Sequence, residues 1–156
     1  MAPFYLHDGA AVTIQTCRFL SNTVRVPVGS SYGGAIAIDP GCAAKLDSCS
    51  FANNYAATGD LDVCFGGAIS VGSTARLTAE RCVFFGNIAA GFEGGSGGAV
   101  ASFDDARVEI QGCEFVQNGG GYGGAISANG GLRSSAAGSA PTSALMGAPR
   151  SRTTAT

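Results

Sequence analysis

The stretch GGAIAIDPGCAAKLDSCSFANN, residues 33–54, contains the two motifs that decide the fold of this chain. It begins with the glycine pair Gly33 and Gly34, followed by a short apolar run, and it ends with Cys49, Phe51 and Asn54. The first glycine precedes the cysteine by 16 residues and the phenylalanine by 18. Because the same motifs recur at the same spacing, the sequence indicates a repeat architecture.

Both motifs occur four times in the 156 residues of the chain. The GGA(I/V) motif begins at Gly33, Gly66, Gly97 and Gly123. The Cys-x-Phe-x-x-Asn motif supplies a structural ladder of Cys17, Phe19, Asn22, Cys49, Phe51, Asn54, Cys82, Phe84, Asn87, Cys113, Phe115 and Asn118. The segment between each asparagine and the next glycine pair varies from 4 to 11 residues. One part of the repeat therefore has a fixed length, while the other is free to vary.

The fixed part shows apolar residues two apart, with an odd step between successive pairs. Ile36 and Ile38 form one pair, and Leu46 ends another pair three residues before Cys49. Residues two apart lie on one face of a strand, whereas an odd step changes the face. The pattern predicts three short strands joined by corners and contains no long helical stripe.

A repeat with three short strands and one variable loop is typical of one coil of a parallel β-helix. We predict an all-β fold, a single-stranded right-handed parallel β-helix (β-solenoid) of about four coils, over residues 1–132. Equivalent side chains would stack at about 4.8 Å. The glycines are expected to adopt positive φ, and the ladder asparagines are expected to adopt the left-handed conformation and to bond through stacked amides.

The two ends of the chain depart from the repeat. Residues 133–156 are rich in Ser, Ala, Thr, Pro and Arg, and we predict a disordered tail there. Neither end shows an obvious cap, although an open solenoid end exposes unpaired strands. We therefore expect the chain to be a fragment of a longer protein, or to self-associate end to end through its uncapped coils.

Composition removes several classes of partner. The net charge is −2, so no basic field favours nucleic acid. No apolar run reaches the roughly 18 residues that a transmembrane segment needs. The start, MAPFYLHDG, has neither the basic region nor the apolar region of a signal peptide, so we predict none in this chain.

The alternation of GGA(I/V) with Phe-x-x-Asn, over about residues 5–128, resembles the repeats of the polymorphic outer membrane proteins of chlamydiae. These are autotransporters whose passenger regions are β-helices. The resemblance implies an extracellular or cell-surface location and a non-catalytic structural or adhesive role. The repeats are also similar to the coils of the pectin lyase-like fold, which implies an alternative: a fragment of a pectate-lyase-like polysaccharide lyase or glycoside hydrolase.

Few positions carry the groups that catalysis requires, and we predict no catalytic residue. The outward positions of the first strand, such as Ala35 and Ala37, have no carboxylate or base. Asp47 and Glu80 should be neighbours on adjacent coils, where they form a solvated face, share a cation, or act as an acid/base pair. His7 is the only histidine, which excludes metal sites that need several. We predict no metal and no cofactor.

The variable segments offer the best candidates for binding. An aromatic residue stands immediately before three of the four glycine pairs, where it either contacts a ligand or covers the corner. The candidate ligand-binding residues on this loop side are Tyr32, Asp60, Asp62, Phe65, Phe92 and Tyr122. The predicted partner is a glycan or a cell-surface protein.

The six cysteines fall into two groups. The four ladder cysteines should be buried and inert, although Cys17 could formally pair with His7 as a catalytic dyad. Cys42 and Cys64 lie off the ladder and are the better candidates for a disulfide or a reactive thiol. The sequence leaves the redox compartment open.

Overall fold

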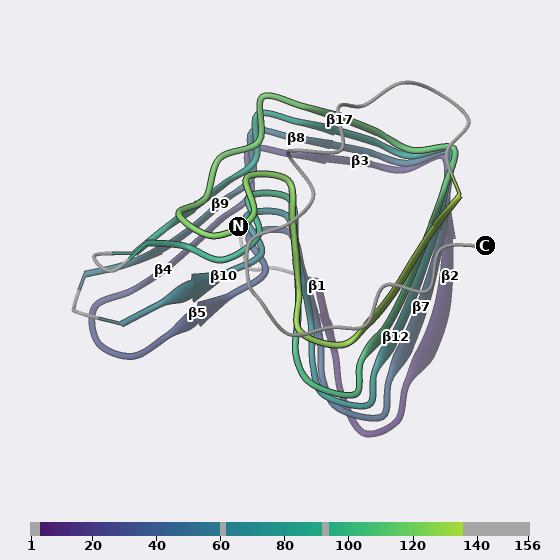
Figure 1. The fold of residues 1–156 in the computed structure, drawn as a ribbon, viewed down its shortest axis with the longest axis horizontal. Helices are drawn as coiled ribbons and strands as arrows, with labels where there is room; N and C mark the ends of the chain where they lie inside the picture. The colour runs from purple at the N-terminus through teal and green to yellow at the C-terminus, as the bar shows by residue number, and fades with distance from the viewer. Residues whose placement is uncertain (1–3, 60–61, 92–93, 136–156) are drawn as a thin grey trace.

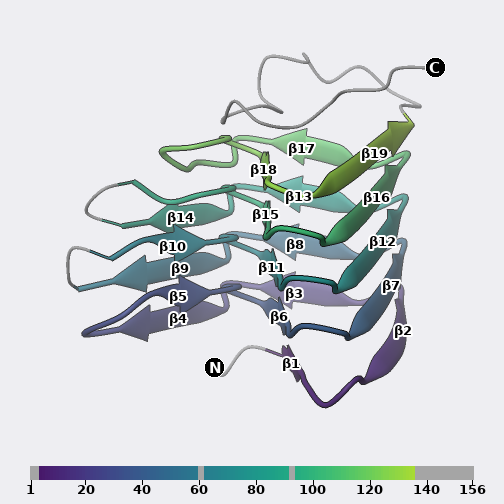
Figure 2. The ribbon, with the colours of Figure 1, turned by 60° about the horizontal axis from the view of Figure 1, so that its bottom comes forward.

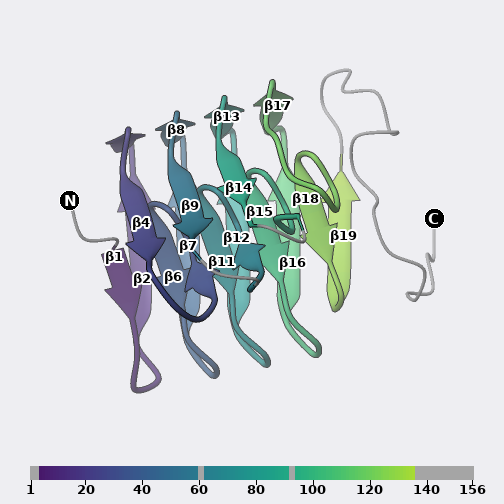
Figure 3. The ribbon, with the colours of Figure 1, turned by 90° about the vertical axis from the view of Figure 1, so that its left-hand side faces the viewer.

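A computed structural model of the chain describes residues 4–59, 62–91 and 94–135. The described residues form strands joined by tight corners, and each turn of the chain makes one coil (Figure 1). The coils follow one another along a single axis, from the N-terminal coil to the C-terminal coil (Figure 3). The fold is a right-handed parallel β-helix, which confirms the predicted class. Within the described residues, no helix is long and apolar enough to span a membrane.

Three parallel sheets enclose the main core (Figures 1 and 2). Sheet A consists, within the described residues, of β1 (Phe4–Leu6), β6 (Ile36–Ile38), β11 (Ile69–Val71), β15 (Val100–Ser102) and β18 (Ile126–Ala128). Sheet B likewise consists of β2 (Ala11–Gln15), β7 (Ala43–Asp47), β12 (Arg76–Glu80), β16 (Arg107–Gln111) and β19 (Gly131–Ser135). Sheet C consists of β3 (Arg18–Leu20), β8 (Ser50–Ala52), β13 (Val83–Phe85) and β17 (Glu114–Val116).

The variable segments form a lobe that projects from the main core (Figure 1). Its outgoing arm leaves sheet C through β4 (Thr23–Val26), β9 (Tyr55–Thr58) and β14 (Ile88–Ala90). Its return arm leads to sheet A through β5 (Ser31–Tyr32) and β10 (Cys64–Phe65). The strands of both arms also pair in parallel from coil to coil, so the lobe is part of the β-helix.

Identical residues stack in columns through the main core. The ring centroids of Phe51 lie 4.7 Å from Phe19 and 4.9 Å from Phe84, and Phe115 continues the stack at 4.7 Å from Phe84. Ile36 pairs in register with Ile69 on the next coil, and both are fully buried. Each coil thus provides the apolar floor for the next, which a single coil cannot do alone.

Both glycines of the GGA(I/V) motif are required by the backbone. Gly66 has a φ of +67°, and a Cβ on it would lie 1.9 Å from the carbonyl oxygen of Ile69. A Cβ on Gly67 would lie 2.1 Å from the carbonyl oxygen of Gly98 on the next coil. The first glycine therefore permits the turn into sheet A, and the second permits the close approach of adjacent coils.

The ladder asparagines join the coils at the corner between sheet C and the lobe. The side-chain amide of Asn54 donates to Asn87 Oδ1 at 2.8 Å, and that of Asn87 donates to Asn118 Oδ1 at 2.9 Å. The expectation that these asparagines are left-handed is wrong, because the positive φ belongs to the residue before each of them, for example +54° at Asn53. That residue makes the corner and leaves the asparagine free to bond along the axis.

The repeats extend slightly further than the predicted boundary. Strand β19 continues to Ser135 and pairs with β16, so residues 133–135 of the predicted tail belong to sheet B. The rest of that tail, residues 136–156, lies outside the described residues. At the other end of the chain Cys17 is exposed, because no described coil precedes it, whereas Cys49 and Cys82 are buried.

Candidate functional surface

The outer face of sheet A is covered. Ala37 was expected to point outward from the core, but its side chain is buried. Ala37, Ser70 and Ala101 occupy one row of it, and each is at most 6% exposed. The return arm of the lobe folds back over this face. Its Ser96 hydroxyl, for example, lies 2.7 Å from the hydroxyl of Ser127 on β18. The small side chains of this face are therefore packing positions, required by the close approach of the arm.

Aromatic residues fill the angle between the return arm and sheet A. Tyr32 and Phe65 stack from coil to coil with their ring centroids 5.5 Å apart. Phe103, which follows β15, packs against both, at 4.7 Å from Phe65 and 5.8 Å from Tyr32. Tyr32 remains 45% exposed. These rings therefore cover the corner and also present a face to solvent, and contact with a ligand stays a prediction.

Of the other predicted loop-side residues, the structure describes Tyr122 and Asp62, and neither has a ring contact with this group. Tyr122 is 56% exposed. On the coil between Tyr122 and Phe65, Ser96 occupies the equivalent position and pairs with both. Asp62 is partly buried in the connection between β9 and β10. Asp60 and Phe92 lie outside the described residues. Among the described members of the predicted set, Tyr32 and Phe65 are the two that stack on one another.

A polar group adjoins the aromatic residues and was missed from the sequence. Tyr5, on the outer face of β1, donates its hydroxyl to Asp39 Oδ2 at 2.5 Å and stacks on His7 with centroids 5.6 Å apart. This hydrogen bond with Asp39 raises the pKa of Tyr5. Asp39 follows β6 as Phe103 follows β15, in the same row of sheet A, with Gly72 on the coil between them. A Cβ on Gly72 would lie 2.9 Å from Pro40 Cδ, so Pro40 packs against this position of the row.

We call Tyr5, Tyr32, Asp39, Phe65 and Phe103 the aromatic surface. Four coils contribute to it, so its shape depends on the stacking of the coils. Phe103 and Asp39 each lie just beyond a strand end, outside both repeated motifs. A sequence signal existed, since each lies two residues after an outward position, but no spacing rule linked them to Tyr32.

The outer face of sheet B carries the charged residues. Asp47 and Glu80 lie on adjacent coils in register, as predicted. Lys45 Nζ lies 3.2 Å from Glu80 Oε1, and Arg81 forms an ion pair with Asp47. A hydrogen bond from Ser48 and the charge of Arg81 lower the pKa of Asp47. Asp47 and Glu80 therefore belong to an ion-paired surface.

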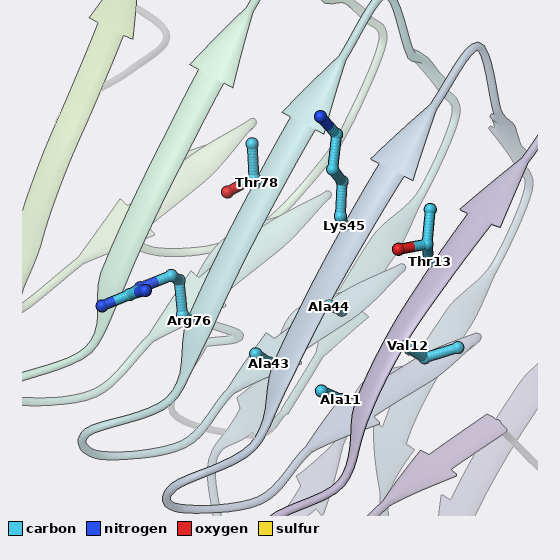
Figure 4. A pocket seen from close by; sticks show the side chains of 8 residues that line it. All are labelled: Ala11, Val12, Thr13, Ala43, Ala44, Lys45, Arg76 and Thr78. Carbon is cyan, nitrogen blue, oxygen red and sulfur yellow. The ribbon is translucent and has the colours of Figure 1, made fainter.

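A shallow hollow of about 260 Å³ lies on the same face (Figure 4). Lys45 and Arg76 project at its two sides, and Ala43 and Thr78 lie between them. Ligand pockets commonly measure about 300–1,000 Å³ and are lined by aromatic side chains. This hollow is smaller and has no aromatic lining residue, which makes it a weaker candidate than the aromatic surface.

The described cysteines differ in burial and in pKa. Burial raises the pKa of Cys49, and the hydrogen bond with Cys113 together with burial raises that of Cys82. The same hydrogen bond lowers the pKa of Cys113, which is only partly buried. Cys42 and Cys64 are both buried, Cys42 in the main core and Cys64 in the lobe with Ala56 and Ala89, so they do not face one another. Among the described residues, no three acidic, cysteine or histidine side chains group as a metal site would require.

His7 and Cys17 have separate surroundings. His7 contacts Asp8, with its Nδ1 atom 2.8 Å from Asp8 Oδ2, and stacks on Tyr5. Cys17 lies at the other side of the coil, immediately before β3 of sheet C. Neither side chain forms a hydrogen bond with the other, so the structure lends no support to a dyad between them.

The chain matches the family model of the right handed beta helix region over residues 1–137. Because the match covers most of its 156 residues, the protein belongs to this family. Comparisons with curated proteins and with solved structures gave no match. Family membership defines the architecture, and the surfaces described above carry the argument about function.

Proposed function

We propose that this β-helix is a non-catalytic segment of a secreted or surface-displayed repeat protein, and that it binds a glycan or a cell-surface protein through the aromatic surface. The observation that carries the proposal is the exposed stack of Tyr32 on Phe65, supported from behind by Phe103. The buried face of the stack fixes its position, and the exposed face is available to a ligand.

The chemistry of the aromatic surface suits a sugar. Aromatic rings offer rigid contact area at a small cost in conformational entropy, because they rotate about only two side-chain bonds. The apolar face of a pyranose ring packs on such a ring, while its hydroxyls donate to a carboxylate. Asp39 supplies an acceptor on the same face, and the hydroxyl of Tyr5 is already bonded to it.

Two further observations support the location and the absence of catalysis. The GGA(I/V) and Phe-x-x-Asn motifs resemble those of polymorphic outer membrane proteins, which are surface-displayed. The carboxylates Asp47 and Glu80 are held in ion pairs with Lys45 and Arg81. The alternative, a fragment of a polysaccharide lyase or glycoside hydrolase, would need an acid and a base facing a substrate cleft.

The test is a glycan array combined with binding to host-type cell surfaces, using the full chain, Tyr32→Ala and the control Tyr55→Ala. Tyr55 is also exposed, at 36%, but lies on the outgoing arm. We expect the wild type and Tyr55→Ala to bind equally and Tyr32→Ala to lose at least about tenfold in affinity. Equal binding by all three would show that the aromatic surface is not the site.

Catalysis is tested separately with polygalacturonate and related glycans, with and without calcium. We expect no new unsaturated or reducing ends above the level of a buffer control. A cleavage activity that copurifies with the chain would contradict the proposed role and support the lyase or hydrolase alternative.

A further inference from the structure

The outer face of sheet C is apolar and exposed. Leu20 is 47% exposed, Val83 40% and Phe85 41%, although the neighbouring inner positions hold the buried phenylalanine stack. The face lies on the side of the main core away from the aromatic surface, which borders sheet A (Figure 1). Large apolar side chains gathered on one solvent-facing sheet surface mark an interaction site more often than isolated ones do.

The side chains of this face form two rows along the helix axis. The strand register places the first row in the order Arg18, Ser50, Val83 and Glu114. The second row is Leu20, Ala52, Phe85 and Val116. A positive charge thus ends the first row on the N-terminal coil, and a negative charge ends it on the C-terminal coil. Within the described residues neither Arg18 nor Glu114 has an ion-pair partner.

We propose that the outer face of sheet C binds the same face of a second copy of this chain, with the two helix axes antiparallel. A two-fold axis parallel to the strands reverses the order of the coils and keeps the positions along each strand. Arg18 then lies opposite the Glu114 of the second copy, and Glu114 lies opposite its Arg18. A two-fold interface is self-complementary, so each such contact occurs twice.

The same operation matches large side chains with small ones. Phe85 lies opposite the Ala52 of the second copy, and Val83 lies opposite its Ser50. Leu20 lies opposite its Val116, which makes an apolar pair of two larger side chains. At the first two pairs, a bulky side chain on one copy therefore fills the space next to a small side chain on the other copy. Such interdigitation is what packs two sheet faces closely.

The alternative two-fold arrangement does not share this complementarity. An axis parallel to the helix keeps the order of the coils and reverses the strands. Arg18 would then lie over an apolar Leu20, and Glu114 over Val116, so both charges would be desolvated without a partner. The antiparallel arrangement is therefore the one that the row order selects.

The interface is small and the dimer is correspondingly weak. Four rungs about 4.8 Å apart and three residues of about 3.3 Å each give a face of roughly 19 by 10 Å. The two faces together bury on the order of 400 Å², far below the roughly 1,200–2,000 Å² of stable complexes, so the association is weak and reversible. A dimer through sheet C would carry two aromatic surfaces, and two linked sites hold a multivalent surface more strongly than one.

The test measures the molar mass of the full chain by sedimentation equilibrium up to about 1 mM protein, a range that detects weak association. The variants are Arg18→Glu, Glu114→Arg and the double variant carrying both changes. We expect the wild type to form a dimer, and each single variant to weaken it at least about tenfold, because like charges then face each other twice. The double variant restores opposite charges and should recover the wild-type dissociation constant.

The control is Arg107→Glu, which makes the same charge change on the outer face of sheet B. It should leave the dimer unchanged, and circular dichroism should show that all variants keep the β-structure. A monomeric wild type at the highest concentration would overturn the proposal. So would open-ended growth beyond the dimer that the charge variants leave unaffected, because that would place the contact at the ends of the β-helix.

Discussion

The main core and the lobe are built on the same coil-to-coil pairing but packed with different side chains. The main core contains stacked phenylalanines and columns of Ile, Leu and Val. The lobe core consists of Ala56, Cys64 and Ala89. Large side chains in the main core must lie directly above one another, so the number of residues between them cannot change. Small side chains in the lobe impose no such condition, which is why its connections vary in length.

The largest effect is expected from Phe84→Ala in the main core. Phe84 is fully buried between Phe51 and Phe115, so truncation leaves a cavity in the middle of the stack. We expect the free energy of unfolding to fall by about 4 kcal/mol, measured by urea denaturation. A loss as small as that of the lobe variant described below would mean that the stack is not the main source of stability.

A somewhat smaller effect is expected from Asn87→Ala, at the corner where the main core meets the lobe. Asn87 is fully buried, accepts hydrogen bonds from Asn54 and donates to the carbonyl oxygen of Phe51. Removing its amide leaves several buried polar groups without partners. We expect a loss of about 3 kcal/mol, against a change of less than about 0.5 kcal/mol for the exposed control Asn129→Ala. Equal losses would argue against the amide ladder.

The lobe is expected to tolerate truncation. Cys64→Ala removes a buried thiol that bonds the carbonyl oxygen of Ala90 at 3.1 Å, in surroundings made of alanine. We expect the free energy of unfolding to fall by only about 1 kcal/mol, in the same denaturation experiment. A loss equal to that of Phe84→Ala would show that the lobe contributes as much stability as the main core.

The smallest effect is expected on the charged face of sheet B. The pKa of Asp47 is lower in the folded state than in the unfolded state. Its charge therefore stabilises the folded state fully at pH values above the unfolded-state pKa of about 3.9. This contribution is lost as the pH falls through the lower folded-state value. Asp47→Asn should therefore melt slightly below the wild type at neutral pH, and the two should converge in acid, below the lowered folded-state pKa of Asp47. A difference that persists in acid would assign the effect to something other than the charge.

The repeat was predictable because its signals are local. The positions of Gly33, Cys49 and Phe51 follow a spacing that stacking requires, and the register places these residues as that spacing predicted. The left-handed corner was assigned one residue too late, because any small or polar residue before the asparagine serves that position, as Ser21 and Gln117 show. Spacing identifies a column but does not say which residue turns the chain.

The candidate site was predictable only in part, because it depends on how the lobe folds. Tyr32 and Phe65 were found from their place before the glycine pairs, but Phe103 packs on them from sheet A. Tyr5 and Asp39, which bond to each other, lie on other coils of the same sheet. The direction of the return arm decides the contact with Phe103. For the same reason the row containing Ala37 and Ser70 is buried, although its pattern alone describes a solvent-facing position.

The order of residues along the chain was enough to establish the coil, the parallel pairing and the identity of the stacked columns, because one side-chain size must recur at one slot for the turns to fit together. The folded structure alone decided which outer faces are covered and which are open. The lobe bends over sheet A and leaves sheet C exposed, and this choice depends on contacts between segments whose lengths are free to vary.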